Sequence, residues 1–371
     1  MATRGRVMFS VAQESFESAV RELRDTYGRG LDGERLGPDL GVLATSEPTA
    51  RDVAAACRSR PLAFIRHVTT ELVRLPPADA ADLDAVAAAA RSLLADNPVG
   101  RDLAVQTWLS GEARLGYGSG ELFAHLSEAL SRDGISVFRA GRPHVLSACI
   151  HQLGVSLGLN RAEDSLSDWP GGRMRLSRDP TQVSRAEFKL EELFAVSSLP
   201  LPSAGRAVDL GASPGGWTRI LRRHGLEVWA VDPGDLDPRV TADPLVHHAR
   251  TTAGVFLRST DMRFDLAVND MRMDPVRSCE VMLNAAAHLR RGAFAIVTLK
   301  TGTHQAVDTL QRCLALLRRS YEIVSARQLH HNRHEVTVVA RAQRGVPVNR
   351  ARRPGPGQVR IGGRPGCATG A

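Results

Sequence analysis

The sequence predicts a doubly wound α/β domain over residues 184–342, preceded by an α+β domain over residues 1–160. From Val183 onward, apolar strand-like segments alternate with helical segments, which is typical of a largely parallel sheet covered by helices. A glycine-rich turn follows the first of these strands. Ligands of such sheets bind beyond the carboxyl ends of the strands, so we expect the chemistry of this protein in the second domain.

The order of elements in the α/β domain follows from the apolar pattern. We expect helices at 185–196, 217–225, 279–290 and 304–319, and strands at 207–210, 227–232, 264–270, 293–300 and 335–340.

The first 160 residues have a more mixed pattern. We expect strands at 6–11, 63–75 and 103–111, a long strand or hairpin at 144–159, and helices at 15–28, 49–57, 82–96 and 121–134. This pattern favours mostly antiparallel pairing, and it contains no cluster of catalytic residue types. The domain would bind, position a substrate or serve as a scaffold. Residues 161–183 are expected to be a linker to the second domain.

Composition indicates a globular chain of 371 residues, with 43% hydrophobic and 24% charged residues. The N-terminus lacks the long apolar run of a secretory signal, and the alanine-rich run at 85–95 contains Arg91, so neither a signal peptide nor a membrane span is expected. The five cysteines are far apart and form no CxxC pair, which favours reduced thiols in the cytoplasm over disulfides or structural zinc.

The net charge of +8 is concentrated near the end of the sequence. Residues 341–371 carry seven Arg and no acidic residue, which leaves 41 basic and 40 acidic residues elsewhere. The segment is rich in Gly, Pro and Arg, so we expect residues 343–371 to be a disordered basic tail. The tail would contact nucleic acid non-specifically or have no role.

Lysine is nearly absent from this chain. Of 48 basic residues, 46 are Arg, and the two lysines are Lys189 and Lys300. A lysine ammonium can lose its proton when its surroundings lower its pKa, whereas Arg stays protonated in proteins. The two lysines are therefore candidates for a function that Arg cannot fulfil, although their survival by chance is the alternative.

A glycine-rich turn joins the strand at 207–210 to the next helix. Its sequence is Asp209-Leu210-Gly211-Ala212-Ser213-Pro214-Gly215-Gly216-Trp217. The glycines allow a tight turn and close approach of a ligand, and the helix offers its N-terminal amides to an anionic group. Asp232 ends the following strand, where a carboxylate can accept hydrogen bonds from ribose hydroxyls. A glycine-rich turn alone would also fit NAD binding, but the GxGxxG pattern is missing here.

The segment DLGASPGGWT at 209–218 resembles the cofactor loop of the FtsJ-type ribose methyltransferases. Further segments resemble that family: SRAEFKLEELF (184–194), VNDM (268–271), VTLK (297–300) and HHNRHEVTV (330–338). The resemblance implies a Rossmann-like methyltransferase sheet, S-adenosylmethionine as cofactor, and RNA 2′-O-methylation by the tetrad Lys189, Asp270, Lys300 and Glu335. It also implies cofactor contacts from Ser184, Asp209, Gly211, Ser213, Pro214, Gly215, Gly216, Trp217, Asp232 and Asp270.

Within that family, the segment SDWPGG at 167–172 resembles the RlmM-type subgroup. That subgroup methylates a cytidine ribose in large-subunit ribosomal RNA and has a THUMP-containing N-terminal region. The resemblance therefore implies a ribosomal RNA partner and a THUMP/ferredoxin-like fold for residues 1–160. It also implies an acidic residue beside the adenine within 247–256, where this sequence has none. Asp243, Asp261 or a backbone group are the alternatives.

The tetrad suits the reaction that the resemblance implies. A ribose 2′-hydroxyl is a poor nucleophile, and its proton must leave as the methyl group arrives. A lysine base works best with its pKa lowered from about 10.4 toward the operating pH, which burial and a neighbouring cation promote. Lys300 would be the base and Lys189 the neighbouring cation, while Asp270 and Glu335 keep the cluster hydrogen-bonded. The alternative is a structural salt-bridge cluster.

Two other functions remain open at this stage. A small-molecule O-methyltransferase could use the same fold, although the paired lysines argue against it. A non-catalytic RNA-binding or ribosome-assembly factor could retain a cofactor pocket. The histidines at 330, 331 and 334 could suggest a metal, but no Cys or carboxylate cluster completes a ligand set, so we expect a polar loop and no metal.

Overall fold

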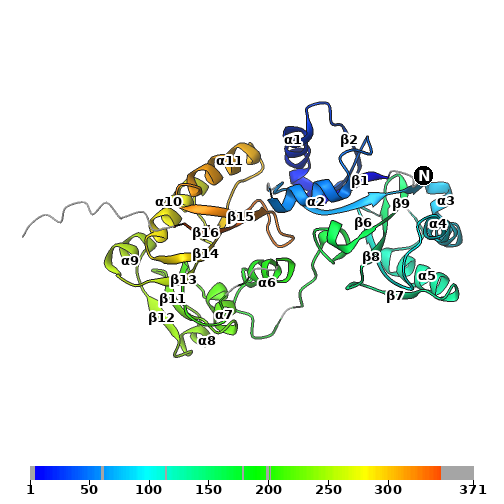
Figure 1. Ribbon diagram of the computed structural model, residues 1–371. Helices are drawn as coiled ribbons and strands as arrows, with labels where there is room; N and C mark the ends of the chain where they lie inside the picture. The colour runs from blue at the N-terminus through cyan, green and yellow to red at the C-terminus, as the bar shows by residue number, and fades with distance from the viewer. Residues whose placement is uncertain are drawn as a thin grey trace, which may run out of the picture.

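The computed structural model describes residues 5–59, 62–112, 115–177, 179–197, 200 and 202–343. The expected basic tail at 343–371 lies outside the described residues, apart from its first residue. The described chain forms three sheets, with the C-terminal sheet at one end of the molecule and two N-terminal sheets at the other (Figure 1).

The first sheet has four antiparallel strands in the order β2-β3-β1-β4. Its elements are β1 (Arg6–Val11), α1 (Phe16–Tyr27), β2 (Gly33–Gly37), β3 (Leu40–Leu43), α2 (Ala50–Ser59) and β4 (Ile65–Glu71). Successive side chains of a strand point to opposite faces. Val7, Phe9 and Val11 therefore share one core with α1 and α2, while Met8 packs in a separate cluster with Trp108 of the second sheet.

The second sheet has the strand order β5-β9-β8-β6-β7, and β6 pairs in parallel with both β7 and β8. Its elements are β5 (Val73–Leu75), α3 (Pro77–Ala80), α4 (Leu83–Asp96), β6 (Asp102–Leu109), α5 (Ser119–Arg132), β7 (Ser136–Phe138), β8 (His144–His151) and β9 (Gly154–Arg161). The apolar run at 144–159 is a hairpin of β8 and β9. The N-terminal α+β region thus contains two sheets.

The segment after β9 packs against both N-terminal sheets. It forms a short 3₁₀ turn, η3 (Pro170–Gly172), and Ser10 Oγ on β1 donates a hydrogen bond to the Gly171 carbonyl at 2.7 Å. Met174 just beyond the turn is buried. The first part of the expected linker at 161–183 is therefore part of the packed N-terminal structure, because its backbone and apolar side chains have partners on both sheets.

The third sheet has seven strands in the order β12-β11-β10-β13-β14-β16-β15. Its elements are α6 (Glu187–Val196), β10 (Arg206–Leu210), α7 (Gly216–Arg223), β11 (Glu227–Val231), α8 (Pro238–Thr241), β12 (Val246–Ala249), α9 (Ala253–Ser259), β13 (Phe264–Asn269), α10 (Pro275–Ala286), β14 (Leu289–Leu299), α11 (Ala306–Leu317), β15 (Tyr321–Arg327) and β16 (Val336–Ala342). All neighbouring strands are parallel except β16, which runs antiparallel to β14 and β15. The predicted doubly wound sheet is confirmed.

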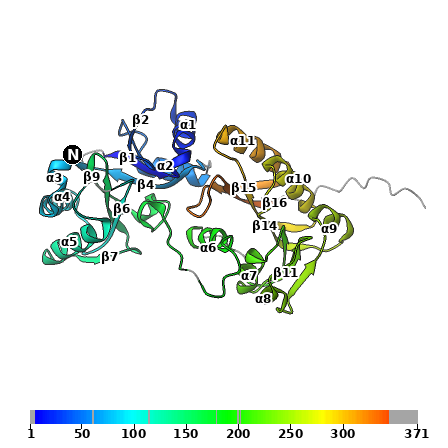
Figure 2. The same ribbon diagram turned by 180° about the vertical axis from the view of Figure 1, so that it is seen from behind.

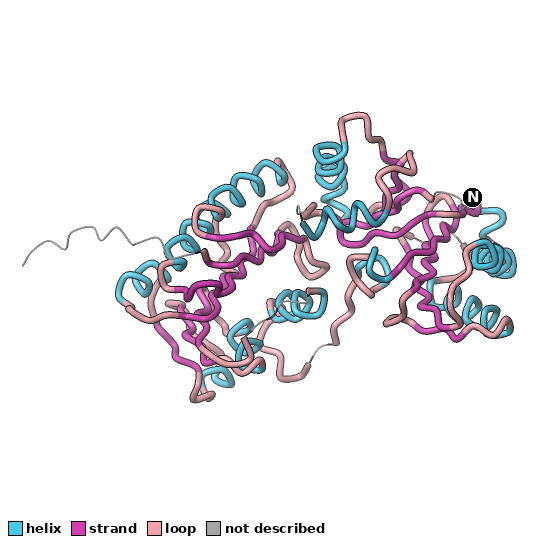
Figure 3. Tube along the Cα trace, viewed as in Figure 1, coloured by secondary structure: helices cyan, strands magenta, loops and turns pink. Residues whose placement is uncertain are grey.

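Helices cover both faces of this sheet, as Figures 2 and 3 show from opposite sides. The interior strand β14 has apolar side chains on both faces. Phe294 and Ile296 pack in the cluster that contains α6 and α7, whereas Ala295, Val297 and Leu299 pack in the cluster that contains α9, α10 and α11. Both faces are apolar, so the strand has the continuous hydrophobic run typical of a buried parallel strand.

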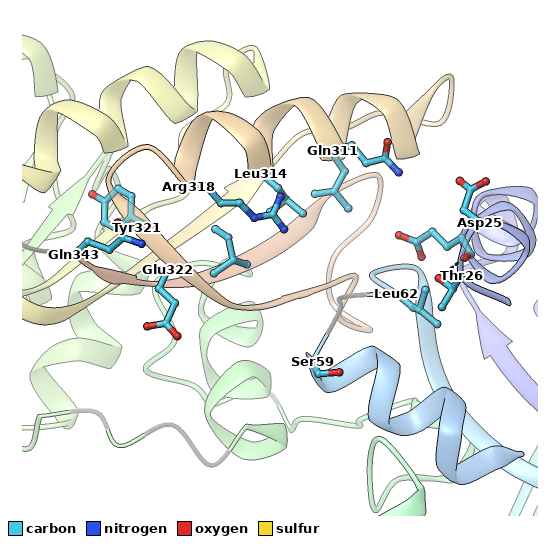
Figure 4. A pocket seen from close by; sticks show the side chains of 13 residues that line it. Asp25, Thr26, Ser59, Leu62, Gln311, Leu314, Arg318, Tyr321, Glu322 and Gln343 are labelled. Atoms are coloured by element: carbon cyan, nitrogen blue, oxygen red, sulfur yellow. Dashed lines mark hydrogen bonds between the residues drawn. The ribbon is translucent and has the colours of Figure 1, made fainter. Parts of the chain in front are cut away.

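The N-terminal region and the C-terminal sheet share one core. A single buried cluster contains residues of β1, α1 and α2 together with residues of α10, α11, β14 and β16. At its edge, Arg21 on α1 forms a two-bond ion pair with Asp308 on α11, at 2.5 and 2.7 Å. A cavity of about 550 Å³ opens beside this pair, lined from both sides (Figure 4). No helix in the described ranges is long and apolar enough to cross a membrane.

Candidate active site

Four polar side chains meet at the carboxyl edge of the C-terminal sheet. Asp270 follows β13 and Lys300 follows β14, so both leave neighbouring parallel strands at the same edge. Glu335 reaches that edge from the amino end of β16, because β16 is antiparallel to β14. Lys189 comes from the first turn of α6, which covers the same part of the sheet.

Each lysine contacts both carboxylates. Lys189 Nζ lies 3.0 Å from Asp270 Oδ1 and 2.7 Å from Glu335 Oε2. Lys300 Nζ lies 2.7 Å from Asp270 Oδ1 and 3.1 Å from Glu335 Oε1. The four residues predicted as a tetrad therefore form a closed square of two ammonium and two carboxylate groups.

The square is largely shielded from solvent, since its four side chains are 14–19% exposed. Burial alone would raise the pKa of Asp270, but the charges of Lys300 and Lys189 outweigh burial and hold that pKa below its ordinary value. Burial likewise opposes the charge of Lys189, but Asp270 and Glu335 together raise the pKa of Lys189 above its ordinary value. Lys189 and Asp270 are therefore both ionised at neutral pH.

A threonine that the sequence analysis missed belongs to the same cluster. Thr298 Oγ1 donates a short hydrogen bond to Asp270 Oδ1, and it accepts one from Lys300 Nζ at 3.1 Å. Thr298 is fully buried on β14, two residues before Lys300. Residues two apart on a strand face the same side, so the segment VTLK contained the signal for this contact.

The glycine-rich turn between β10 and α7 has the close packing expected of a binding loop. Gly211 has φ +82° and Gly215 has φ +111°, backbone values that residues with a side chain rarely adopt. A Cβ added at Gly211 would lie 2.1 Å from Cγ of Met271, the residue that follows Asp270. A Cβ added at Gly216 would lie 2.2 Å from Ser184 Oγ. The loop, the Asp270 segment and the segment before α6 are thus in contact, and the backbone conformations of Gly211 and Gly215 favour glycine.

Asp232 and Ser184 offer unused hydrogen-bonding capacity beside this loop. Asp232 is half-buried at the end of β11, and its carboxylate accepts bonds from the amides of Ser213 (3.2 Å) and Gly234 (2.7 Å). The Ser184 hydroxyl is buried and has no hydrogen-bond partner among the described residues. A buried hydroxyl without a partner is costly, so this position suits a ligand that supplies one.

Three other loop residues expected to contact a cofactor have protein partners. The Asp209 carboxylate is fully buried and accepts a 2.7 Å bond from Thr218 Oγ1, and burial raises its pKa to about 7. The Trp217 indole is buried and donates to the Ala186 carbonyl at 2.8 Å. The Pro214 carbonyl accepts a 2.8 Å bond from the Asp237 amide. Asp209 and Trp217 thus hold the turn between strand and helix through these hydrogen bonds.

The two acidic residues considered for the adenine side lie at the wrong edge of the sheet. Asp243 precedes β12, accepting a 2.9 Å bond from Arg222 at the end of α7, and Asp261 precedes β13. Both positions are at the amino ends of parallel strands, opposite the tetrad. The carboxyl end of β12 instead carries Arg250, which pairs with Asp235. This leaves backbone groups near 249–253 as the candidate contacts.

The three histidines after β15 bind carboxylates or pack against one another. His331 Nδ1 lies 2.7 Å from Glu192 Oε2, His334 Nδ1 lies 3.5 Å from Glu14, and the His330 ring packs edge-on against His331. Throughout the part of the chain that the structure describes, no three His, Cys, Asp or Glu side chains form a group that could hold a metal ion.

The sequence of this region matches a known family. Residues 182–342 match the model of the FtsJ-like methyltransferases. They form an FtsJ-like methyltransferase domain. This span contains the tetrad, the glycine-rich turn and all seven strands of the third sheet, so the methyltransferase domain coincides with the sheet that carries the site.

Curated relatives match this domain and part of the region before it. The chain is 37% identical over 177 residues to the ribosomal RNA large subunit methyltransferase M of Halorhodospira halophila, covering 47% of this chain and 51% of that protein. It is 34% identical over 224 residues to the protein of that name from Alkalilimnicola ehrlichii, covering 58% and 61%. The matches thus span between half and two thirds of these relatives. The solved structure of TrmN from Thermus thermophilus aligns with 91% of this chain and 99% of its own, at 16% identity and a TM-score of 0.40.

Proposed function

We propose that this protein transfers a methyl group from S-adenosylmethionine to the 2′-oxygen of a ribose in RNA, and that this RNA is ribosomal RNA. The observation that carries the proposal is the square of Lys189, Asp270, Lys300 and Glu335 next to the glycine-rich turn. The family of residues 182–342 and the names of the relatives support the reaction class and the RNA substrate. An enzyme acting on ribosomal RNA would work in the cytoplasm.

The residues around the turn suit the proposed cofactor. Asp232 ends β11 with a half-exposed carboxylate, a position that in such sheets binds ribose hydroxyls. Ser184 holds a buried hydroxyl without a partner, and the amides at the start of α7 can bind a carboxylate. When bound, S-adenosylmethionine supplies an electrophilic methyl group on a sulfonium.

The tetrad performs the proton chemistry in this proposal. Lys300 Nζ, as the neutral amine, takes the proton of the 2′-hydroxyl, and Lys189 stays charged and orients the oxygen. Asp270 and Glu335 each contact both lysine nitrogens, so they fix the two nitrogens relative to each other and balance the positive charge. Thr298 holds the Asp270 oxygen that Lys300 contacts.

The N-terminal region has a positioning role in this proposal. Residues 1–160 form two sheets without a second catalytic cluster in their described part, and they pack directly on the methyltransferase domain. We assign this region the task of holding RNA against the tetrad, as the expected THUMP-like role requires.

The test is methyl transfer from labelled S-adenosylmethionine to ribosomal RNA that lacks the modification. Nucleoside mass spectrometry should find a 2′-O-methyl nucleoside, and the modified linkage should resist alkaline cleavage. A methyl group on a base or on a small metabolite would contradict the proposal. Absence of any transfer, with RNA bound, would favour a non-catalytic RNA-binding or assembly factor.

A further inference from the structure

The loop that carries Glu335 is held from two sides. It runs from Gln328 to Glu335, between β15 and β16, and contains few apolar residues. Such a loop needs outside partners to keep one conformation, because its backbone groups are not paired in a helix or sheet. The position of Glu335 in the tetrad therefore depends on the residues that bind this loop.

The first support comes from the methyltransferase domain itself. Glu192 lies on α6, one turn after Lys189, and is 2% exposed. Its carboxylate accepts bonds from the amides of His330 (2.6 Å) and His331 (2.8 Å) and from His331 Nδ1 (2.7 Å). Burial opposes the charge, but these donors outweigh it and lower the pKa of Glu192. The helix that carries Lys189 thus also fixes the loop that carries Glu335.

The second support comes from the N-terminal region. Arg66 on β4 donates hydrogen bonds to three carbonyls of the loop: Gln328 (3.3 Å), Leu329 (3.1 Å) and Asn332 (3.1 Å). The backbone amide of Gln328 in turn donates a hydrogen bond to the Ala63 carbonyl at 2.7 Å. The N-terminal region and the loop at 328–335 therefore share four hydrogen bonds.

The contact continues from Arg66 to the tetrad through one side chain. Asn332, whose carbonyl binds Arg66, is buried and accepts bonds from the Leu329 amide (2.9 Å) and Thr337 Oγ1 (3.0 Å). Its Nδ2 donates to Glu335 Oε2 at 3.4 Å, the oxygen that Lys189 contacts. Arg66 is thus linked to the catalytic carboxylate through a single ordered residue.

We propose that Arg66 is a positioning residue for the methyl-transfer reaction, through which the N-terminal region sets the place of Glu335. The planar guanidinium suits this task, because it presents several donors in a fixed geometry to carbonyls that a lysine could not all reach. The N-terminal region then completes the active site as well as contacting RNA. The effect on catalysis rests on the proposed function, whereas the effect on the loop does not.

The experiment compares three variants of the full chain: Arg66→Ala, Arg66→Lys and Arg21→Ala. Arg21 forms the ion pair with Asp308 across the same junction but has no contact with the loop, so Arg21→Ala controls for weaker docking. The first measurement is amide hydrogen exchange of residues 328–336, and the second is single-turnover methyl transfer with saturating RNA and cofactor. Cofactor affinity is measured by calorimetry.

Arg66→Ala should speed exchange in 328–336 and slow methyl transfer about 10-fold or more, a scale reached by small displacements of catalytic groups. Cofactor affinity should stay within about twofold, which a general loss of structure would not allow. Arg66→Lys should recover part of the rate, and Arg21→Ala should match wild type. If Arg66→Ala fails to fold, Arg66→Lys gives both measurements.

Unchanged exchange in 328–336, or faster exchange with an unchanged methyl-transfer rate, would overturn the proposal. An equal slowing in Arg21→Ala would also overturn it, since docking in general would then be the cause. A wild-type protein that transfers no methyl to RNA would count against the proposed function. In that case the exchange measurement alone decides whether Arg66 holds the loop.

Discussion

Lys300 Nζ lies 2.7 Å from Asp270 Oδ1, and both residues leave neighbouring parallel strands at the same edge of the sheet. The same oxygen also contacts Lys189 Nζ and the hydroxyl of Thr298. Asp270 is therefore the central acceptor of the cluster, and it keeps two ammonium groups close together that would otherwise repel each other.

Replacing each lysine with arginine should show which of the two is the base. Lys300→Arg keeps a positive charge beside Asp270 but removes the proton acceptor, because guanidinium does not titrate in the accessible range. We expect methyl transfer to slow about 10²-fold or more, the usual scale of a general base. Lys189→Arg should slow transfer less, since it keeps the charge and misplaces the hydroxyl. The measurement is single-turnover transfer to saturating RNA.

The pH profile provides the control for this comparison. The wild-type rate should rise from about pH 6 to 10, because a lysine base must lose its proton before it can accept one. Lys300→Arg should lose that rise, and Lys189→Arg should keep it. A Lys300→Arg protein with the wild-type rate and profile would refute the base assignment.

Asp232 should contribute to cofactor affinity. Asp232→Ala removes a carboxylate at the end of β11, and we expect binding of S-adenosylmethionine to weaken by roughly 1.5–3 kcal/mol, as for a lost hydrogen bond to a charged group. Titration calorimetry measures this directly. Asp235→Ala is the matched control, since Asp235 is exposed and pairs with Arg250. Equal affinities of wild type and Asp232→Ala would remove Asp232 from the site.

Glu22 should make stability depend on pH. Glu22 is buried on α1 and lines the cavity in Figure 4. Its carboxylate accepts hydrogen bonds from the backbone amides of Ala63 and Phe64, both at 3.1 Å. Burial raises the pKa of Glu22 to about 8. Between about pH 4.5 and 8 the folded protein keeps this proton and the unfolded chain loses it. The free energy of unfolding should therefore fall as pH rises through this range, by an amount on the order of a few kcal/mol.

Thermal unfolding at about pH 5 and about pH 8.5 tests this sign. The Gln side chain of Glu22→Gln cannot ionise. As pH rises, the melting temperature of this variant should therefore increase relative to that of wild type. Glu17→Gln, at an exposed position on the same helix, should follow wild type. If the melting temperatures of wild type and Glu22→Gln differ by the same amount at both pH values, Glu22 does not titrate in this range.

The basic segment at the end of the sequence should act on RNA affinity and not on chemistry. A chain that stops after Gln343 lacks six Arg and should bind RNA more weakly at low salt. Its plot of log affinity against log salt should be shallower by about 0.7 for each lost phosphate contact to single-stranded RNA. Single-turnover transfer at saturating RNA should stay near wild type. A large loss of that rate would instead place the segment in the active site.

The four residues of this edge could be named from the sequence because the resemblance to the FtsJ-type family implied them, and composition alone had already singled out the two lysines. Asp270 and Lys300 follow apolar strands that a parallel sheet aligns, and Lys189 stands out in a chain with 46 Arg. The turn at 209–217 combines glycines with a strand before and a helix after. The structure places Asp270 and Lys300 together because they follow neighbouring parallel strands, and α6 brings Lys189 to the same edge.

Other features depend on tertiary contacts that no local pattern reports. Asp209 and Trp217 belong to the same motif as the glycines, yet both are buried against protein partners. The strand β12 (Val246–Ala249) was missed, because it has four residues, two of them histidine, and is stabilised by pairing with β11. Arg66 binds a loop more than 260 residues away, so spacing could not indicate it.

The shared core between the N-terminal region and the methyltransferase domain limits how this protein can be divided. One buried cluster runs from Phe16 and Leu23 on α1 to Leu310 and Leu317 on α11. Calorimetric melting should therefore show a single cooperative transition for most of the chain. A methyltransferase domain expressed alone would expose apolar surface and aggregate. Chimeras that exchange the N-terminal region should then succeed only when the α1–α11 contact is exchanged as well.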